Sequence, residues 1–462
     1  MRGHAACSLG LAISLSLPEM NILSITSWYP PYHAGGYGML CYRLSEGLLA
    51  RGHKVSVLTL ANSEHECPQD PGDYSVQCNV IRTFRRVDSR NLIRGTLANH
   101  RETRRVLYAR KPDIVIFFST LETGFQVYHD VLASGLPCLM VLGDTWLAQA
   151  WADLPRYDDY VGFASGRGQG IKAWSKRVLG FALKSQGLFN GCKPISLTPV
   201  MAISSFLLDA LAKAGVPQLD IAKQCRVFPL PVLPPFIDVN GNPAGMSFPC
   251  GNRPLSRIQE EGITQDTTDN RVFRIICVSR LDPQKGQDDV IRALALVRQQ
   301  GLNATLTLAG MDRYGYCEIL RRLITDLHVE SYVSIITNLE EEQIKQLYCS
   351  HDVFVFPSRI IEGLGIVCVE AMACGLPVVA TSPGGQDDLV IPNSTGFRYA
   401  PADIEGLARH LTHLAGDLSL MSRLRREALK LASRHYSVSV MDDFERRIQE
   451  VVQEHISRAK HL

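Results

Sequence analysis

Short apolar segments alternate with segments of helical periodicity along most of the chain. NILSIT (21–26) is the first apolar segment, and Leu40, Leu44 and Leu48 then recur at the spacing of one helix face. HKVSVLTL (53–60) is the next apolar segment. A strand, a helix and a second strand in this order predict a βαβ unit, whose two strands run parallel.

The same order recurs in the second half of the chain. Its apolar segments are short and nearly continuous, as expected of strands that are covered on both faces. The predicted strands are 113–118 and 137–144 in the first half and 272–280, 304–310, 332–337, 352–358 and 377–382 in the second. The predicted helices of the second half are 286–301, 313–328, 340–350 and 365–374. The sequence therefore predicts an α/β protein with two Rossmann-like, doubly wound parallel-sheet domains.

Composition changes between the two halves, where residues 236–270 are rich in Gly, Pro, Asn and Asp and predict a partly disordered linker. The predicted division is an extension at 1–19, an N-terminal Rossmann-like domain at 20–235, the linker, a C-terminal Rossmann-like domain at 271–435 and a last helix at 436–462 that returns to the N-terminal domain. Ligands of such folds bind at the carboxyl ends of the strands, here in a cleft between the domains.

The start of the chain allows two interpretations. Residues 1–19 carry one arginine and a short apolar run, as a weak signal peptide does. The run is too short to span a bilayer, and the first core strand follows directly, so we favour a flexible extension. No other stretch approaches 18 uninterrupted apolar residues, and we expect no transmembrane helix.

Composition narrows the class of protein. The 462 residues are 46% hydrophobic and 20% charged with a net charge of +2, which is typical of a globular protein and not of a nucleic-acid binder. The 13 cysteines form no CxxC motif and no Cys/His cluster at zinc spacing. We therefore expect free thiols in a reducing cytosol.

The stretch at 358–381 carries two carboxylates among small and apolar residues: Glu362 in a turn and Glu370 in the following helix. Gly363 and Gly365 let the backbone approach a ligand, and the start of a helix favours a phosphate. A carboxylate near that phosphate suits a ribose diol, which offers two hydroxyl donors. The alternative is that Glu370 is a solvated helix residue and Glu362 an ordinary turn residue.

Two cations follow the first strand of the second half. Arg280 ends the segment VSR, and Lys285 lies after a proline-bearing turn, directly before a helix. Cations at the carboxyl end of a strand would neutralise a diphosphate as it leaves. The alternative is a pair of surface charges around a turn.

These features together resemble glycosyltransferase family 4, which has the GT-B fold and transfers sugars from nucleotide donors with retention of configuration. The resemblance covers most of 20–455 and is strongest over 272–400. EGLGIVCVE (362–370) matches the E-x7-E motif of the family, and AMACGLPVVAT and GGQDD follow it. The GGYG sequence at 35–38 is a weaker match.

The resemblance assigns roles by position. Arg280 and Lys285 would bind the donor diphosphate, Glu370 the ribose, and Glu362 the transferred sugar. Further donor contacts would come from Gly36, Gly363, Leu364, Gly365, Ile366, Gly384 and Gly385, and the phosphate or acceptor loop would be Gly35, Gly36, Tyr37 and Gly38. The donor, UDP- or GDP-linked, is a co-substrate, and the family is usually metal-independent, so we expect no cofactor and no metal.

Two positions depart from the family pattern. Gly143 stands where many members have a histidine that faces the reacting sugar, and Asp144 and Trp146 follow it. Asp144 would then replace the histidine as a catalytic residue, or it caps the next segment. Asp388 stands where the family usually has a glutamate after the paired glycines, so its contact with the sugar is left open.

Two segments bear on the acceptor. Residues 82–111 hold nine arginines and one lysine against Asp88 and Glu102, which predicts a solvated helix face or a site for an anionic membrane or lipid-diphosphate acceptor, rather than for nucleic acid. Residues 171–184 place Trp174 on an apolar side with lysines nearby. We favour a helix packed on the N-terminal domain over an interfacial amphipathic helix.

The leading hypothesis is a retaining glycosyltransferase that moves a sugar from a nucleoside-diphosphate donor to a hydroxyl of a glycan or lipid-linked acceptor. Such work suits the assembly of cell-surface polysaccharide or lipopolysaccharide, in the cytoplasm and peripherally at the inner face of the plasma membrane. The alternatives are a nucleotide-sugar epimerase of the same fold and a catalytically silent sugar-nucleotide-binding protein.

Overall fold

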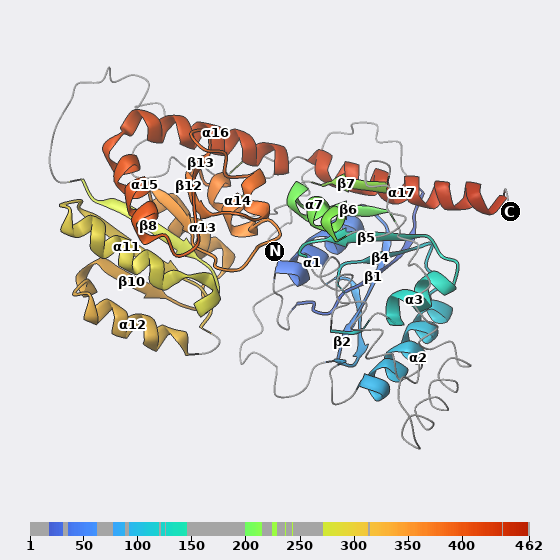
Figure 1. The fold of residues 1–462 in the computed structure, drawn as a ribbon. Coiled ribbons are helices and arrows are strands. Elements are labelled where there is room, and N and C mark those ends of the chain that lie inside the picture. Colours follow the sequence, from blue (N-terminus) through green and yellow to red (C-terminus); the bar gives the residue numbers. More distant parts are fainter. Residues whose placement is uncertain are drawn as a thin grey trace, which may run out of the picture.

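The computed structural model of the chain describes residues 18–30, 36–61, 77–87, 92–119, 122–124, 126–145, 199–214, 224–228, 236, 243, 271–312, 315–436 and 438–460. These residues form two domains, each a parallel sheet with helices packed against it (Figure 1). The predicted α/β, GT-B-like architecture of two Rossmann-like sheets is confirmed.

The N-terminal domain contains, in its described part, a seven-stranded parallel sheet in the order β3-β2-β1-β4-β5-β6-β7. Its strands are β1 (Asn21–Ile25), β2 (Lys54–Leu60), β3 (Asn79–Phe84), β4 (Ile114–Phe117), β5 (Cys138–Leu142), β6 (Val200–Ala202) and β7 (Cys225–Val227). Its helices are α1 (Gly36–Ala50), α2 (Leu92–Arg110), α3 (Gln126–Ala133) and α7 (Ser205–Lys213). The central strands β4 and β5 are buried along their whole length, as strands covered on both faces must be.

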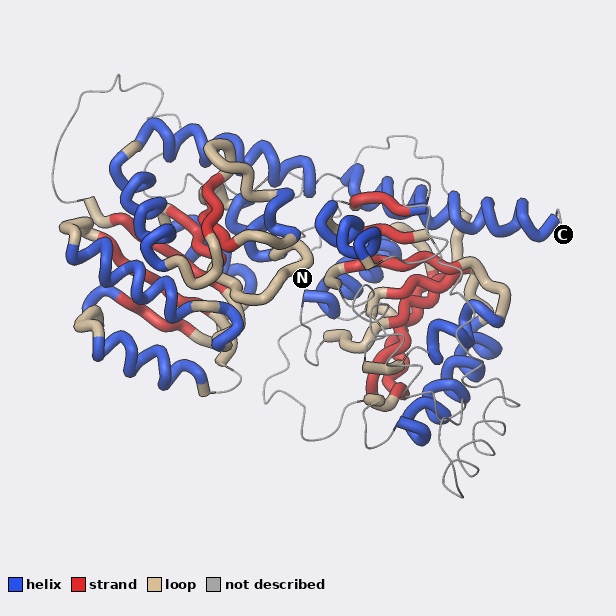
Figure 2. Tube along the Cα trace, in the orientation of Figure 1, coloured by secondary structure: helices blue, strands red, loops and turns tan. Residues whose placement is uncertain are grey.

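The C-terminal domain contains a six-stranded parallel sheet in the order β10-β9-β8-β11-β12-β13. Its strands, red in Figure 2, lie between helices. Its strands are β8 (Phe273–Val278), β9 (Ala304–Ala309), β10 (Val333–Ile336), β11 (Val353–Phe356), β12 (Val378–Thr381) and β13 (Gly396–Tyr399). Its helices are α11 (Gln287–Gln299), α12 (Tyr316–Asp326), α13 (Glu341–Ser350), α14 (Ile366–Ala373), α15 (Ile404–Gly416) and α16 (Leu418–Tyr436), with short 3₁₀ turns η1 (Pro283–Lys285), η2 (Glu330–Tyr332) and η3 (Gly385–Asp388).

The last helix, α17 (Val438–Lys460), leaves the C-terminal domain and runs along the N-terminal one (Figure 1). It packs against the end of α1, where Arg51 Nη1 lies 2.6 Å from Asp442 Oδ1. The ring of His53, which follows α1, lies 2.9 Å from Glu445 Oε1. The expected helix at 436–462 therefore contacts the N-terminal domain within its described residues.

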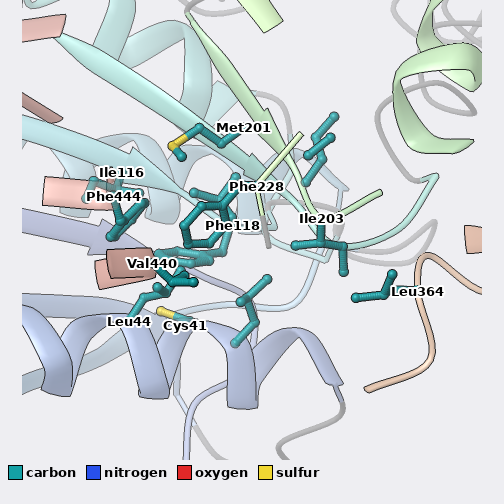
Figure 3. Close-up of a cluster of buried hydrophobic side chains, with 14 of the residues drawn as sticks. Cys41, Leu44, Ile116, Phe118, Met201, Ile203, Phe228, Leu364, Val440 and Phe444 are labelled. Atoms are coloured by element: carbon teal, nitrogen blue, oxygen red, sulfur yellow. The ribbon is translucent and has the colours of Figure 1, made fainter. Parts of the chain in front are cut away.

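The apolar core of the N-terminal domain includes side chains from far along the chain (Figure 3). Phe444 of α17 packs against Phe228, with 5.3 Å between ring centroids. Leu364, from the C-terminal domain, points toward Ile203 in the same cluster. The apolar core is therefore continuous between the two domains.

Most elements lie where the sequence predicts them, and four strands do not appear in that prediction. These are β3, β6, β7 and β13. β3 is a partly exposed edge strand, and β6 and β7 have only three residues each, so none of these has a long apolar run. Every cysteine in the described part of the chain is a free thiol, and all except Cys349 are buried.

None of the described helices is long and apolar enough to cross a bilayer.

Candidate functional site

The site is formed where the loops that follow β8 and β11 meet. These two strands are parallel neighbours, with Val353 paired to Ile275 and Phe354 to Ile276. Their carboxyl ends therefore lie side by side at one edge of the sheet. The loop after β8 carries Arg280 and Lys285, and the loop after β11 carries the turn at 358–365.

Lys285 and Glu362, which the sequence analysis assigns to different parts of a donor, contact each other directly. The Nζ atom of Lys285 donates a hydrogen bond to Glu362 Oε1, and both side chains are largely buried. Ser358 Oγ also donates to Glu362 Oε1, at 2.7 Å. The side chain of Asp282 caps the 3₁₀ turn that contains Lys285, accepting from Gln284 N at 2.9 Å. The lysine of the Lys285–Glu362 ion pair therefore belongs to a turn whose backbone is fixed by this cap.

Arg280 lies at the end of the same strand with a less complete set of partners. Its Nη2 is 3.4 Å from Asp282 Oδ2, and a third of the side chain is exposed. Its Nε is buried and has no hydrogen-bond partner among the described residues. The Arg280 carbonyl accepts from Gln287 Nε2 at 2.8 Å, which fixes the backbone at this point. The guanidinium therefore retains donor capacity for an anion.

The turn after β11 is tied to the start of α11. Arg359 Nη2 lies 2.6 Å from Asp289 Oδ1 and 2.7 Å from Asp288 Oδ2. The two aspartates are in the first turn of α11, where negative charge is favourable. These contacts hold the turn that carries Glu362 in a fixed position.

The glycines of this region permit close backbone packing. A Cβ added to Gly385 would lie 1.6 Å from the Gly363 carbonyl oxygen, a distance that no side chain can occupy. Gly385 N donates to Glu362 O at 2.8 Å. Gly365 has φ +80° and precedes α14, so its left-handed conformation starts the helix whose free N–H groups follow the turn. The loop with Gly384 and Gly385 therefore packs directly on the E-x7-E turn.

Glu370 is buried in α14, with 7% of the residue exposed. Its carboxylate is not solvated, and the alternative of a solvated helix residue is wrong. The partner is Arg43 of α1, whose Nη2 lies 3.2 Å from Glu370 Oε1. Burial raises the pKa of Glu370, and the charge of Arg43 opposes that rise.

The N-terminal domain contributes further contacts to this edge. Ser204 Oγ donates to the Gly363 carbonyl at 2.5 Å. A Cβ on Gly363 would lie 1.9 Å from the carbonyl oxygen of Gly143, so the end of β5 abuts the turn. Gly36 at the start of α1 is close to Ile366, with 3.6 Å between a Cβ built on Gly36 and Ile366 Cδ1. Two loops of the N-terminal domain thus lie against the turn and the start of α14.

Several other predicted residues have a defined place. Tyr37 and Gly38 belong to α1 rather than to a loop, and Leu364 is buried. Asp144 follows β5, beside the turn: its Cα would lie 3.1 Å from a Cβ on Gly363. Asp388 accepts from Ser205 N at 2.6 Å, and so links η3 to the start of α7. Gly35, Trp146 and the segment at 171–184 lie outside the described residues, as does the linker at 236–270 apart from Phe236 and Pro243.

Sequence reasoning missed three contributors: Arg43, Ser204 and Ser358. Arg43 had a signal, because it follows Leu40 by three residues and so falls on the buried face of an amphipathic helix. A charged residue on such a face needs a partner from another element. The two serines had no distinguishing pattern around them.

Two family models match the chain. Residues 34–184 match the model described as Glycosyltransferase Family 4, and residues 259–431 match the model described as Glycosyl transferases group 1. The first range covers the end of the glycine loop and α1 to α3, and the second covers the cations and both glutamates.

Similar proteins of known name are also glycosyltransferases. The GDP-mannose-dependent alpha-(1-6)-phosphatidylinositol monomannoside mannosyltransferase of Mycolicibacterium smegmatis is 36% identical over 170 residues, which are 36% of this chain and 43% of that protein. The match therefore spans less than half the length of that relative. An uncharacterized glycosyltransferase of Methanocaldococcus jannaschii is 25% identical over 90% of this chain and 95% of its own.

Solved structures share the fold at low identity. HepE of Anabaena, in a complex with UDP and glucose, superposes with a TM-score of 0.60 at 20% identity, over 93% of this chain and 100% of its own. Sucrose-phosphate synthase of Thermosynechococcus elongatus gives a TM-score of 0.63 at 18% identity, over 94% and 99%.

Two Rossmann-like domains in contact at the carboxyl ends of their strands define the GT-B class of glycosyltransferase. Within that class, the chain belongs to glycosyltransferase family 4.

Proposed function

We propose that the protein is a retaining glycosyltransferase that transfers a sugar from a nucleoside-diphosphate donor to a hydroxyl of a glycan or lipid-linked acceptor. The observation that carries this proposal is the contact between Lys285 and Glu362 beside the start of α14, with Arg280 on the same loop as Lys285. It puts two cations, one carboxylate and a helix N-terminus at one edge of one sheet.

The charges suit a diphosphate leaving group. When the bond between the sugar and the diphosphate breaks, negative charge develops on the departing oxygen. Lys285, Arg280 and the free N–H groups of α14 would stabilise that charge. Lys285 is now neutralised by Glu362, so a bound diphosphate would compete with Glu362 for the ammonium group.

The carboxylates would hold the rest of the donor. Glu362 would accept hydrogen bonds from hydroxyls of the transferred sugar, beside a pocket edge formed by Gly384 and Gly385. Glu370 would accept from the ribose hydroxyls. The glycines at the start of α1 would bring backbone N–H groups toward the phosphates.

The proposed reaction takes place on one face of the sugar. The bond from the anomeric carbon to the diphosphate oxygen breaks, and the acceptor oxygen forms a new bond to that carbon on the same side. The acceptor hydroxyl gives its proton to the departing diphosphate oxygen, which has the charge to receive it. Configuration is therefore retained without a protein nucleophile, and Asp144 is close enough to the turn to orient the incoming hydroxyl.

Relatives support a proposal for the chemical class of donor and acceptor. One relative is named as GDP-mannose-dependent and acts on a phosphatidylinositol mannoside, and another is an amylovoran biosynthesis glycosyltransferase. We therefore propose a GDP- or UDP-linked sugar as donor and a cell-surface glycan or its lipid-linked precursor as acceptor. The reaction would take place in the cytoplasm, with the basic helix α2 at the membrane surface.

The epimerase alternative has less support. An epimerase needs acid and base side chains at the reacting sugar, and Gly143 offers none at the position where the family often has a histidine. The remaining alternative is a catalytically silent sugar-nucleotide-binding protein. An assay of sugar transfer distinguishes the two, because only the transferase would form a glycosylated product.

The test uses Glu362→Gln, with a thermal-shift and calorimetric panel of UDP-, GDP- and ADP-sugars. The wild type should bind one donor class and transfer its sugar to an added acceptor. Glu362→Gln should abolish transfer, yet bind the free nucleoside diphosphate at least as tightly as the wild type, because Lys285 is released from its partner. Lys285→Met should weaken that binding about tenfold or more, the value of a hydrogen bond to a charged group.

Glu342→Gln is the matched control, because Glu342 is an exposed glutamate of α13 that pairs with Lys345. It should leave binding and transfer unchanged. Full transfer by Glu362→Gln would remove the site assignment, and donor binding without transfer by the wild type would favour the silent binding protein.

A further inference from the structure

Arg43 is a charged residue of the N-terminal domain that is buried against the C-terminal one. Only 5% of the residue is exposed. Its Nη2 lies 3.2 Å from Glu370 Oε1 and 3.3 Å from Glu341 Oε1. Glu370 is on α14 and Glu341 is at the start of α13, so one guanidinium from α1 joins two helices of the other domain.

The position of Arg43 follows from how α1 lies against α14. Gly36, the first residue of α1, is close to Ile366, the first residue of α14. Arg43 follows Leu40 by three residues and directly precedes Leu44, and both leucines are fully buried. The two helices therefore approach at their starts and again at the ion pair, and the pair is positioned by packing on both sides.

The ion pair leaves acceptor sites of Glu370 for the hydroxyls of a ribose. An ionised carboxylate has about four acceptor sites, and the bond from Arg43 occupies one of them on Oε1. Two ribose hydroxyls can donate to the remaining sites. A protonated carboxyl would lose acceptor capacity and present a donor to those hydroxyls instead. A cation at Oε1 therefore keeps the carboxylate in the form that recognises a diol.

Glu341 is a second anion that contacts the Arg43 guanidinium and helps to fix its orientation. Its side chain is 40% exposed, whereas that of Glu370 is 10% exposed. The more exposed carboxylate contacts the same Nη2 atom of Arg43 and stays partly solvated. The inner carboxylate then has a cation whose direction is fixed by a second anion.

We propose that Arg43 is a positioning residue of the nucleotide site: it reaches from the N-terminal domain to hold the Glu370 carboxylate for the ribose diol, so that ribose recognition is complete only when the two domains are in contact. This inference rests on the proposed donor site. It adds a residue from the opposite domain to nucleotide selection and links donor affinity to domain contact.

The test compares ribonucleotides with their 2′-deoxy counterparts by calorimetry, using GDP against 2′-deoxyGDP and UDP against 2′-deoxyUDP. A hydroxyl that donates to a carboxylate is worth about 1.5–3 kcal/mol, so the wild type should prefer its ribonucleotide by about tenfold or more. Arg43→Met should reduce the preference to about twofold. Binding of inorganic pyrophosphate, which has no ribose, should stay unchanged.

The control is Arg51→Met, which removes an arginine directly after the same helix that pairs with a different element, α17. It should keep the full preference for ribose. Arg43→Lys keeps the charge and should restore most of the preference. If Arg43→Met does not fold, Arg43→Gln makes the same comparison, because glutamine keeps a donor and removes the charge.

The outcomes separate this inference from the proposed function. A wild type that binds no nucleoside diphosphate refutes both. A wild type that prefers the ribonucleotide, with the same preference in a folded Arg43→Met or Arg43→Gln, refutes the role of Arg43 alone. A proportional loss of pyrophosphate and nucleotide affinity would also refute it, because that result indicates a general structural role.

Discussion

The hydroxyl of Tyr37 and the backbone N–H of Gly143 form a hydrogen bond of 2.7 Å between α1 and the end of β5. The same hydroxyl donates to the Val141 carbonyl at 2.9 Å. A Cβ at position 143 would lie only 3.2 Å from the tyrosine ring. The ring therefore occupies the space into which a side chain at position 143 would project, and the glycine and the tyrosine belong to one packing arrangement.

Removing the Tyr37 hydroxyl should loosen this arrangement. Tyr37→Phe leaves the ring in place, but Gly143 N–H and the Val141 carbonyl lose their partner. We expect a loss of about 1–2 kcal/mol in the free energy of unfolding, measured from the urea midpoint. Tyr108→Phe is the control, since Tyr108 is 82% exposed on α2 and should show no loss. Equal midpoints for the two variants would contradict the role of the hydroxyl.

Preference for ribose should depend on pH. Burial raises the pKa of Glu370, so its acceptor form is lost as the pH falls through a value above that of an exposed glutamate. The groups that face Glu370 are Arg43 from α1, Glu341 and Tyr348 from α13, and Cys368 from α14. Arg43 is the cation among them and opposes the rise.

The preference for GDP over 2′-deoxyGDP, or UDP over 2′-deoxyUDP, should therefore decline as the pH falls, and the decline should lie above the pH range in which an exposed glutamate titrates. In Arg43→Met the decline should begin at higher pH, because the effect that lowers the pKa is gone. Using the ratio cancels the ionisation of the diphosphate, which the two ligands share. A ratio that is flat with pH in both proteins would show that Glu370 does not titrate against the ribose.

The contact between Gly363 and Gly143 should control how closely the domains approach. Gly363→Ala would place a Cβ 1.9 Å from the Gly143 carbonyl oxygen, and the two loops would have to separate. We expect transfer to fall on the order of a hundredfold, the effect of a small misplacement of reacting groups. X-ray scattering should show a larger radius of gyration.

Gly416→Ala is the matched control for this change. A Cβ at Gly416 has no atom within 4 Å, and the residue ends a helix far from the contact. It should keep the activity and the scattering profile of the wild type. Full activity in Gly363→Ala would show that the domains need not come this close.

The basic helix α2 should direct the protein to anionic membranes. Arg101 and Arg104 are exposed on this helix, which lies on the side of the N-terminal domain away from the C-terminal domain (Figure 1). A basic residue near an anionic surface is worth about 1 kcal/mol, so reversing both charges should weaken binding by more than tenfold. Co-sedimentation with phosphatidylcholine vesicles, with and without phosphatidylserine, measures this.

The control reverses Arg321 and Arg322, which are exposed on α12 of the other domain and change the net charge equally. Binding that responds equally to both pairs would indicate a general charge effect. Binding that is indifferent to phosphatidylserine would exclude the membrane proposal.

The fold was predictable because buried parallel strands leave a strong local pattern. β8, β9, β11 and β12 are short apolar runs between amphipathic helices, and each lies within a few residues of its predicted place. The residues near the carboxyl ends of β8 and β11 were predictable for the same reason, since a parallel sheet brings these ends together. Arg280, Lys285 and Glu362 are therefore close because the strands before them are neighbours.

The contacts between the domains were not predictable in this way. Arg43 and Glu370 are separated by 327 residues, and no periodicity relates one helix face to the other. The prediction that Glu370 binds a ribose did not include its ion pair with Arg43. Likewise, the sequence assigns Lys285 and Glu362 to separate parts of a donor, but the two side chains contact each other. They come from different loops, and the local sequence of one loop does not indicate which side chain of another loop it will contact.

The return of α17 to the N-terminal domain has a consequence for synthesis on the ribosome. Val440 and Phe444 complete a core to which α1 and the end of β7 contribute, yet they are translated roughly 200 residues after β7. At about 5–20 residues per second, that delay is about 10–40 s. During this interval the nascent N-terminal domain has an uncovered apolar surface, so we expect its final folding to wait for the end of the chain and to benefit from a chaperone.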